Sequence, residues 1–447
     1  MADRYWILGT GSWSSTNTVN WSATSGGAGG ASVPTAADDV YFDANSNVLA
    51  TAFTVTMVDT PRVCKDFTAS GLDGTMTLAG ISSIGLTVSG SLTFQATNFS
   101  ATYTGTTTFN ATTTGKTITT NGVAFGGAVT FNGVGGSWAL QTAVTVSGAT
   151  TLTNGTLDLN GKTLTAATRF ATATGALKNL TFNGGTLVSS ISSVTAFNNA
   201  APTNFTTTAG TGTGTISMTS ASAKTFVGGG STFNCTINQG GAGNLTITGS
   251  NTFSNITNTR KSTSAASILF TAGTTNTFAD WNASGESTRL LTIGSVTAAS
   301  HTLSKASGTV SSDFLSISRS TATGGAGWYA GANSTNGGNN SGWIFTAPPA
   351  PEILLGGHFG FDEKKRDAQW AKDQKLEAQR KLKLQEALFG LPPEIREQIT
   401  TAPTQTIEVA VRNQIDYDLL MQKVKDLEVR VKLKRDEEDI AMILEMM

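Results

Sequence analysis

Few residues of this 447-residue chain could act as a nucleophile or as its base. The two histidines are His301 and His358, and the two cysteines are Cys64 and Cys235. A histidine base must lie beside a serine or cysteine, and neither histidine belongs to a recognisable motif of that kind. Two cysteines are too few for a disulfide scaffold or for the roughly four ligands of a structural zinc site. We therefore expect two buried thiols and no nucleophilic centre.

Carboxylates are the other groups that could carry a reaction, because enzymes that cleave polysaccharides use pairs of them. The candidates are Asp158, Asp280, Glu286 and Asp313, which stand singly in the sequence. Single carboxylates at turns more often accept hydrogen bonds from backbone N–H groups. The chain has no phosphate-cradling Gly-x-x-x-x-Gly-Lys-Ser/Thr loop and no calcium-binding nonapeptide repeat. We expect no catalytic residue, no cofactor and no metal ion.

The distribution of charge divides the chain near residue 346. Residues 1–345 contain 13 Lys and Arg and 11 Asp and Glu, whereas the much shorter segment 346–447 contains 16 and 19. The junction, 346–351, reads Thr-Ala-Pro-Pro-Ala-Pro and predicts a stiff, extended linker. We therefore expect two different structural regions joined by this linker.

Short runs of alternating apolar residues fill the first region. They are rich in Val, Ile, Thr and Phe, which is typical of strands, and each is followed by Gly or Asn, which suit tight turns. A recurrence of roughly 20–25 residues favours a mostly β fold in which about 12–15 coils stack as a right-handed parallel β-solenoid over residues 46–345. Tandem β-sandwiches are the alternative. Examples of the runs are residues 86–94, 128–133, 143–148, 156–164, 180–184, 245–249 and 290–294.

The ends of such a solenoid need covers for its open core. Residues 1–45 contain Trp6, Trp13 and Trp21, and we interpret this segment as an N-terminal cap. The alternative is that these tryptophans form a surface on which sugars stack. The segment from Trp328 to Phe345 could close the other end.

These two ends carry a resemblance to known proteins. The motifs are Gly9-Thr-Gly-Ser-Trp13 with Ser32-Val-Pro-Thr-Ala-Ala-Asp-Asp-Val-Tyr-Phe-Asp43, and Thr321-Ala-Thr-Gly-Gly-Ala-Gly-Trp-Tyr329 with Gly337-Gly-Asn-Asn-Ser-Gly-Trp-Ile-Phe345. They resemble the opening and closing segments of repetitive, Gly/Thr/Ser-rich β-helical structural proteins of tailed bacteriophages. The resemblance spans roughly residues 4–345, with the middle matching only in style. It implies a virion fibre, spike or decoration, and it implies no catalytic residues.

The second region, 352–447, is predicted to be largely helical. A helix is expected over 362–389, a short one over 393–399, a strand over 407–411 and a weakly patterned coiled coil over 413–447. The region is either a small helical domain folded on itself or a docking and oligomerisation module. Its candidate attachment residues are the apolar side chains Leu382, Leu384, Leu388, Phe389, Leu420, Val424, Leu427, Val431, Ile440 and Leu444.

Composition narrows the possible partners. The net charge of −1 gives no reason to expect nucleic acid or an anionic membrane as a partner, and no apolar run is long enough to span a bilayer. The N-terminus lacks the apolar core of a signal peptide, so we expect folding in a host cytoplasm. Secreted bacterial adhesins are similar in style but carry such a signal.

The function expected from the sequence is that of a structural virion component. In this hypothesis a rigid solenoid is attached to the tail or capsid, or to sister copies, through its helical C-terminal region. The alternatives are a receptor-binding fibre that recognises host surface glycan and a polysaccharide depolymerase.

Overall fold

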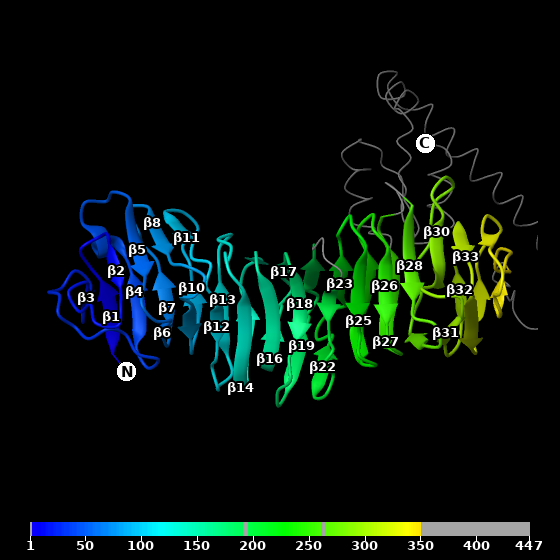
Figure 1. Cartoon of the computed structure of the whole chain (residues 1–447), viewed down its shortest axis with the longest axis horizontal. Coiled ribbons are helices and arrows are strands. Elements are labelled where there is room, and N and C mark those ends of the chain that lie inside the picture. The colour runs from blue at the N-terminus through cyan, green and yellow to red at the C-terminus, as the bar shows by residue number, and fades with distance from the viewer. Residues whose placement is uncertain (1, 191–194, 261–264, 350–447) are drawn as a thin grey trace, which may run out of the picture. The chain divides into compact units, whose positions relative to one another are not determined.

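A computed structural model describes residues 2–190, 195–260 and 265–349 of the chain (Figure 1). The chain divides into two compact units, Met1–Ala350 and Pro351–Met447. The described residues all belong to the first unit. The expected helices over 362–389, 393–399 and 413–447, and the expected strand over 407–411, lie outside the described residues.

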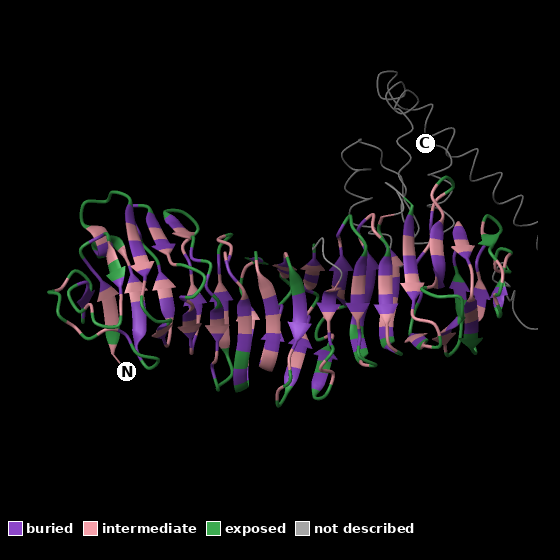
Figure 2. Ribbon diagram, in the orientation of Figure 1, coloured by how far each residue is buried: buried purple, intermediate pink, exposed green. Residues whose placement is uncertain are grey.

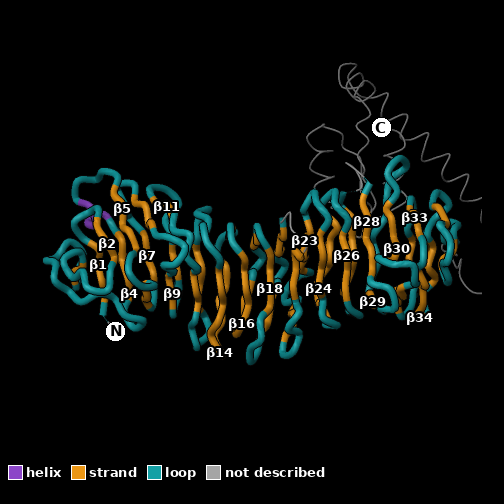
Figure 3. The backbone as a smooth tube through the Cα atoms, in the orientation of Figure 1, coloured by secondary structure: helices purple, strands orange, loops and turns teal. Residues whose placement is uncertain are grey.

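The first unit is a parallel β-solenoid of about 13 turns (Figure 3). One coil shows the plan: β4 (Asp39–Phe42), β5 (Phe53–Met57) and β6 (Arg62–Cys64) follow one another around the axis. Each pairs in parallel with the corresponding strand of the next coil, β7 (Phe67–Ala69), β8 (Met76–Ala79) and β9 (Leu86–Val88). Three ladders of strands therefore run along the solenoid.

The first ladder begins with β1 (Asp3–Trp6) and β4. It continues through β7, β10 (Leu92–Thr93), β13 (Lys116–Thr119), the ends of β14 (Val129–Leu140) and β16 (Ala149–Asp158), β19 (Lys178–Thr181) and β22 (Phe205–Thr208). Further along the chain, the starts of β25 (Thr232–Gln239) and β27 (Thr252–Asn258) pair, followed by β29 (Thr275–Phe278), β31 (His301–Lys305) and β34 (Ser320–Gly324).

The second and third ladders complete each coil. The second contains β2 (Gly11–Trp13), β5, β8, β11 (Phe99–Ala101), then β15 (Val144–Val146), β17 (Thr163–Ala166), β20 (Thr186–Ser189), β23 (Gly214–Met218), the ends of β25 and β27, and finally β32 (Thr309–Ser311), β35 (Gly327–Tyr329) and β37 (Trp343–Ile344). The third contains β6, β9, β12 (Thr107–Phe109), the starts of β14 and β16, β18 (Arg169–Thr172), β21 (Thr195–Asn198), β24 (Lys224–Val227), β26 (Leu245–Thr248), β28 (Ala266–Phe270), β30 (Leu291–Ser295), β33 (Leu315–Ile317) and β36 (Thr335–Asn336).

The register confirms the predicted repeat. In the third ladder Leu245, Ile268 and Ile293 stack directly on one another, so successive coils are 23 and 25 residues long here. Parallel pairing between coils is the pattern of a solenoid, whereas sandwiches are built from antiparallel strands. The alternative of tandem β-sandwiches is therefore wrong for this part of the chain.

Alternating burial explains why these sequences form these strands. In β5 the apolar residues Phe53, Val55 and Met57 are buried and the intervening threonines are partly exposed. The same alternation of buried and less buried residues runs through most coils (Figure 2). Apolar side chains therefore fill the interior, and Thr, Ser and Asn cover the outside. Aromatic rings stack along the axis, and the rings of Phe197 and Phe226 lie 4.5 Å apart at 11°. The coils thereby share one continuous core.

Asn-Gly turns connect several strands as the sequence predicts. Asn121, Asn160 and Asn183 have positive φ values of 49°, 48° and 46°, a conformation that Asn tolerates better than most residues. All three also connect coils, Asn183 through its hydrogen bonds to the Asp158 carboxylate. The side-chain Nδ2 of Asn121 donates to the oxygen of Phe94 at 2.8 Å, and that of Asn160 donates to the oxygen of Leu140 at 3.0 Å.

Tryptophans lie at both ends of the described core. At the N-terminal end β1 (Asp3–Trp6) pairs in parallel with β4 and antiparallel with β3 (Trp21–Ser22), and Trp6, Trp13 and Trp21 are fully buried. At the other end the ring of Trp328 lies 5.7 Å from Trp281 and 5.1 Å from Trp343. The one helical segment among the described residues is the 3-10 turn η1 (Ala44–Asn47), which Asp43 caps.

Candidate functional site

The three N-terminal tryptophans do not form a sugar-binding surface. Their rings pack edge to face, with Trp6 and Trp13 lying 5.1 and 5.2 Å from Trp21. The indole Nε1 of Trp6 donates to the backbone oxygen of Gly9 at 2.7 Å inside the core. A sugar needs an exposed ring face, and none of these rings is exposed, so the interpretation as a stacking surface is wrong.

Asp158, the first candidate carboxylate, is part of a turn. Its Oδ1 accepts the backbone N–H of Asn160 at 2.7 Å, and both carboxylate oxygens accept from Nδ2 of Asn183, in the next coil, at 3.0 and 2.9 Å. The carboxylate thus joins two stacked turns. Its hydrogen bonds are those expected of a structural cap rather than of an acid or base.

The other three candidates lie near the C-terminal end of the solenoid. Asp280 accepts the N–H of Trp281 at 2.9 Å, and its Oδ1 lies 3.8 Å from Nζ of Lys305. Oε2 of Glu286 lies 3.6 Å from the guanidinium of Arg289.

Asp313 is held most tightly. It accepts the N–H of Phe314 at 2.9 Å and both the N–H and Nδ2 of Asn333 at 3.0 and 2.7 Å. The coil repeat brings Glu286 close in space to Asp313, because the backbone N–H of the adjacent Gly285 donates to the backbone oxygen of Asp313 at 3.1 Å. Each carboxylate nevertheless has its own partners, and the four do not form one site.

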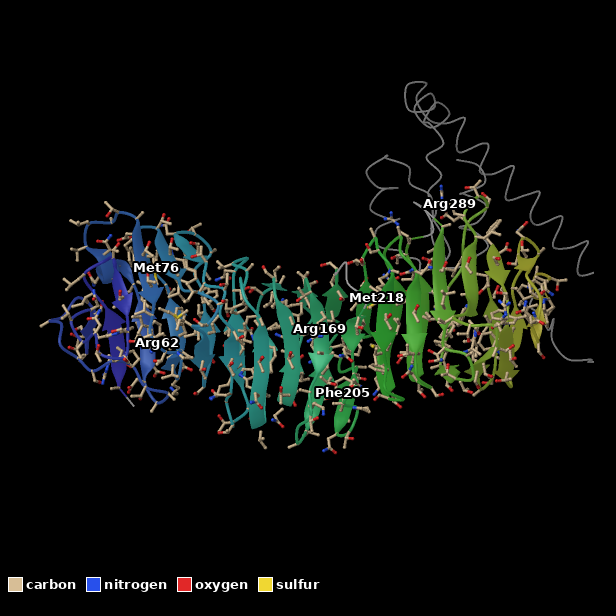
Figure 4. The ribbon with its side chains drawn as sticks, in the orientation of Figure 1. Arg62, Met76, Arg169, Phe205, Met218 and Arg289 are labelled. Carbon is tan, nitrogen blue, oxygen red and sulfur yellow. The ribbon has the colours of Figure 1, made fainter. Side chains whose placement is uncertain are left out.

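Cationic side chains are also dispersed. Figure 4 shows Arg62, Arg169 and Arg289 in three separate parts of the solenoid. Arg62 is buried against Asp59 at 2.7 Å, and Arg169 is exposed at the start of β18. Within residues 2–190, 195–260 and 265–349, no group of three or more His, Cys, Asp and Glu side chains is placed to hold a metal ion.

Both cysteines are buried thiols, as the sequence predicts. Cys64 and Cys235 are free and have no exposed surface. Burial in the apolar interior raises the pKa of each thiol well above its usual range. Since the thiolate is the reactive form, neither side chain is suited to nucleophilic chemistry.

His301 has a serine partner that the sequence did not reveal. Its Nδ1 lies 2.8 Å from Oγ of Ser295, and its ring stacks on Phe270 with centroids 4.8 Å apart. The histidine has no exposed surface, and its Nε2 is buried without a hydrogen-bond partner. A Ser–His pair enclosed in this way has no access to a substrate, so we assign it to the core.

A second unforeseen polar group lies between β24 and β28. Nζ of Lys224 donates to the backbone oxygens of Ser220 and Gly243 at 3.1 and 2.6 Å. Nε2 of Gln239 donates to the same Gly243 oxygen at 2.8 Å and to the oxygen of Ser267 at 3.1 Å. Burial lowers the pKa of the Lys224 ammonium to about 8. No sequence signal pointed to this cluster, because its members lie on different coils.

Exposed apolar side chains gather at the first turns of the solenoid. Leu8, Val48 and Leu49 are 66%, 79% and 75% exposed. They belong to neighbouring coils, because the N–H of Gly9 donates to the oxygen of Ser46 at 2.7 Å. Leu8 also has a φ of 70°, which is strained for a leucine.

The candidate attachment residues Leu382, Leu384, Leu388, Phe389, Leu420, Val424, Leu427, Val431, Ile440 and Leu444 lie outside the described residues. No helix in the described part of the chain is long and apolar enough to cross a membrane. Comparisons of the chain with protein-family models, with curated proteins and with solved structures found no match.

Proposed function

We propose that this protein is a structural component of a tailed-bacteriophage virion. In the proposal a right-handed solenoid forms a stiff projecting part, and residues 352–447 attach it to the tail or capsid or to sister copies. One observation carries the proposal most directly: the coils stack over one continuous core from Trp6 to Trp343. With about 13 turns at strand spacing, the stack is on the order of 60 Å long.

The physical properties of such a stack support a mechanical role. Each coil pairs with its neighbours through three ladders of backbone hydrogen bonds, and threonine side chains such as Thr87, Thr108 and Thr130 lie in register outside. Few charges lie on the outside, which suits stacking because like charges at strand spacing repel. The carboxylates, the thiols and His301, which the sequence singled out as possible reactive groups, form hydrogen bonds or pack within these coils. The end motifs that resemble phage structural proteins supply the link to a virion.

The test is to assemble particles with the full chain and with a chain that ends at residue 349. The proposal expects the shortened chain to fold, with circular dichroism typical of β-structure, but to be absent from purified particles. Incorporation of the shortened chain at the copy number of the full chain would rule out attachment through residues 352–447.

The two alternative functions are outcomes of matching assays on the purified full chain. Saturable binding to purified host surface glycan would replace the structural role with that of a receptor-binding fibre. Release of oligosaccharide from that glycan would make the protein a depolymerase. For that outcome, Asp280→Asn, Glu286→Gln and Asp313→Asn identify the carboxylates involved, and Asp158→Asn is the matched control.

A further inference from the structure

His301 occupies a site in the core that suits only its neutral form. Nδ1 bonds to the Ser295 hydroxyl at 2.8 Å, and that hydroxyl also donates to the backbone oxygen of Arg319 at 3.3 Å. This arrangement assigns the ring proton to Nδ1, because the serine proton is already used. Nε2 then presents a bare lone pair to the apolar interior, where no described residue bonds to it. A protonated ring would instead place an N–H donor and a positive charge there.

Among the residues that the structure describes, no charged group faces the ring so as to compensate a positive imidazolium. The strands packed around it, β28 with Phe270, β29, β30 and β34, contain no charged residue. On its own strand the nearest charge is Lys305, and beside it in the next coil is Arg319, whose backbone oxygen accepts the His301 N–H at 3.1 Å. Both are cations. Asp280 lies at the far end of β31, where it faces Nζ of Lys305.

We propose that His301 is an acid-sensitive latch for the last coils of the solenoid, residues 265–349. Protonation of the ring in mild acid makes its buried position unfavourable, because a charge in the core without a partner loses its hydration and gains nothing in return. The ring must then leave its place on Phe270 and reach water. That movement separates β31 from β29 and β34, and the coils that end at Trp343 open while earlier coils remain stacked.

The size of the effect follows from the shift in acidity. Burial lowers the pKa of His301 from 6.5 to about 4. The unfolded chain therefore binds a proton over this range that the folded chain does not, and stability falls as the pH falls from about 6.5 to 4. Protonation of this one ring changes the equilibrium between closed and open coils by roughly 300-fold at most, a limit that is approached only below pH 4. The inference is independent of the virion role, since it concerns the coils alone.

The chain has two histidines, which makes a direct titration practical. We suggest following the ring signals of the full-length protein by NMR between pH 8 and pH 4, with His358→Phe used to assign them. We expect the His301 signal to remain that of a neutral ring at pH 5 and to change only when the last coils open. Ordinary titration of His301 near pH 6.5 in the folded protein would overturn the proposal.

Hydrogen exchange locates the opening. At pH 4.5, corrected for the slower intrinsic exchange, we expect faster exchange in residues 265–349 and unchanged exchange in residues 40–260 of the wild type. His301→Phe, which keeps a ring on Phe270 but cannot be protonated, should abolish this acceleration, and His358→Phe should retain it. Equal acceleration in His301→Phe and wild type would contradict the latch. The NMR titration of wild type decides the matter if His301→Phe does not fold.

Discussion

Asn160 illustrates how single residues hold neighbouring coils together. It combines a φ of 48° with a side-chain hydrogen bond to Leu140 in the preceding coil. Asn160→Ala should lose both, at a cost of about 1–2 kcal/mol in the free energy of unfolding. Asn160→Gly keeps the backbone conformation and should cost less than Asn160→Ala. Chemical denaturation of the two variants measures the difference, and equal costs would show that the left-handed backbone adds nothing.

Leucine is an unfavourable residue for the backbone conformation at position 8. Leucine at a φ of 70° is strained, and its side chain is 66% exposed, so it contributes little to the core. Leu8→Asn should raise the free energy of unfolding by about 0.5–1 kcal/mol, because Asn adopts this conformation more readily. Val48→Asn in the neighbouring turn is the control and should change stability by less than about 0.5 kcal/mol. A loss of stability in Leu8→Asn would mean that the leucine makes a contact in solution.

Because Lys224 is buried, we expect the free energy of unfolding to depend on pH in the alkaline range. Its folded pKa of about 8 lies below the ordinary lysine value of 10.5, so the unfolded chain retains a proton that the folded chain loses. Stability therefore rises as the pH increases from about 8 to 10.5, by roughly 3 kcal/mol at most. Lys224→Met should remove this rise, and Lys162→Met, an exposed control, should keep it. Denaturant titrations at pH 7.5 and pH 10 measure the free energy of unfolding of the wild type and of each variant. An equal free energy of unfolding at the two pH values in the wild type would contradict the lowered pKa of Lys224.

The positions of many strands could be predicted from the sequence, because they depend on the local alternation of apolar residues. Runs such as 245–249 were recognisable because apolar residues alternate and a glycine follows, and β26 occupies residues Leu245–Thr248. Burial of the tryptophans also followed from their position near the ends. Two strands, β14 and β16, were not foreseen at their full length, because each continues from the third ladder into the first without a turn.

Contacts between coils were beyond sequence reasoning. Ser295 lies on β30 at the end of one coil and His301 on β31 at the start of the next. Lys224 and Gln239 both donate to the backbone oxygen of Gly243 only because consecutive coils pair in one register. A difference of a few residues in coil length changes which side chains coincide. The alternation of apolar residues fixes which side of a strand faces inward, but it does not fix which residues of successive coils lie opposite one another.

The stacked phenylalanine rings allow a prediction about the stability of the core. Phe197 lies between Phe170 and Phe226, with ring centroids 5.6 and 4.5 Å away. Phe197→Ala should lower the free energy of unfolding by about 3–5 kcal/mol, as expected for a cavity in a packed core. Thr206→Ala on the outer surface should change it by less than about 0.5 kcal/mol. Thermal or chemical denaturation measures both, and similar small effects would argue against a shared core.

For the whole molecule, the amino-acid composition and the repeat length explain why the chain forms a solenoid. They do not determine its function, which depends on the assembly that the solenoid belongs to. Stacked coils contact only their neighbours, so length can be added without a new core. This gives a stiff object from a sequence of Thr, Gly, Ser and short apolar runs. The described residues hold their carboxylates, thiols and His301 in structural positions. The structural role in a larger particle remains our proposal for this solenoid.

The virion role can be tested by reconstructing purified phage particles, with and without this protein, by cryo-electron microscopy. We expect a narrow projection, on the order of 60 Å long, into which residues 2–349 fit and which is missing from particles that lack the protein. Particles that show no difference in density, and that contain no copies of the chain by mass spectrometry, would contradict the proposed role.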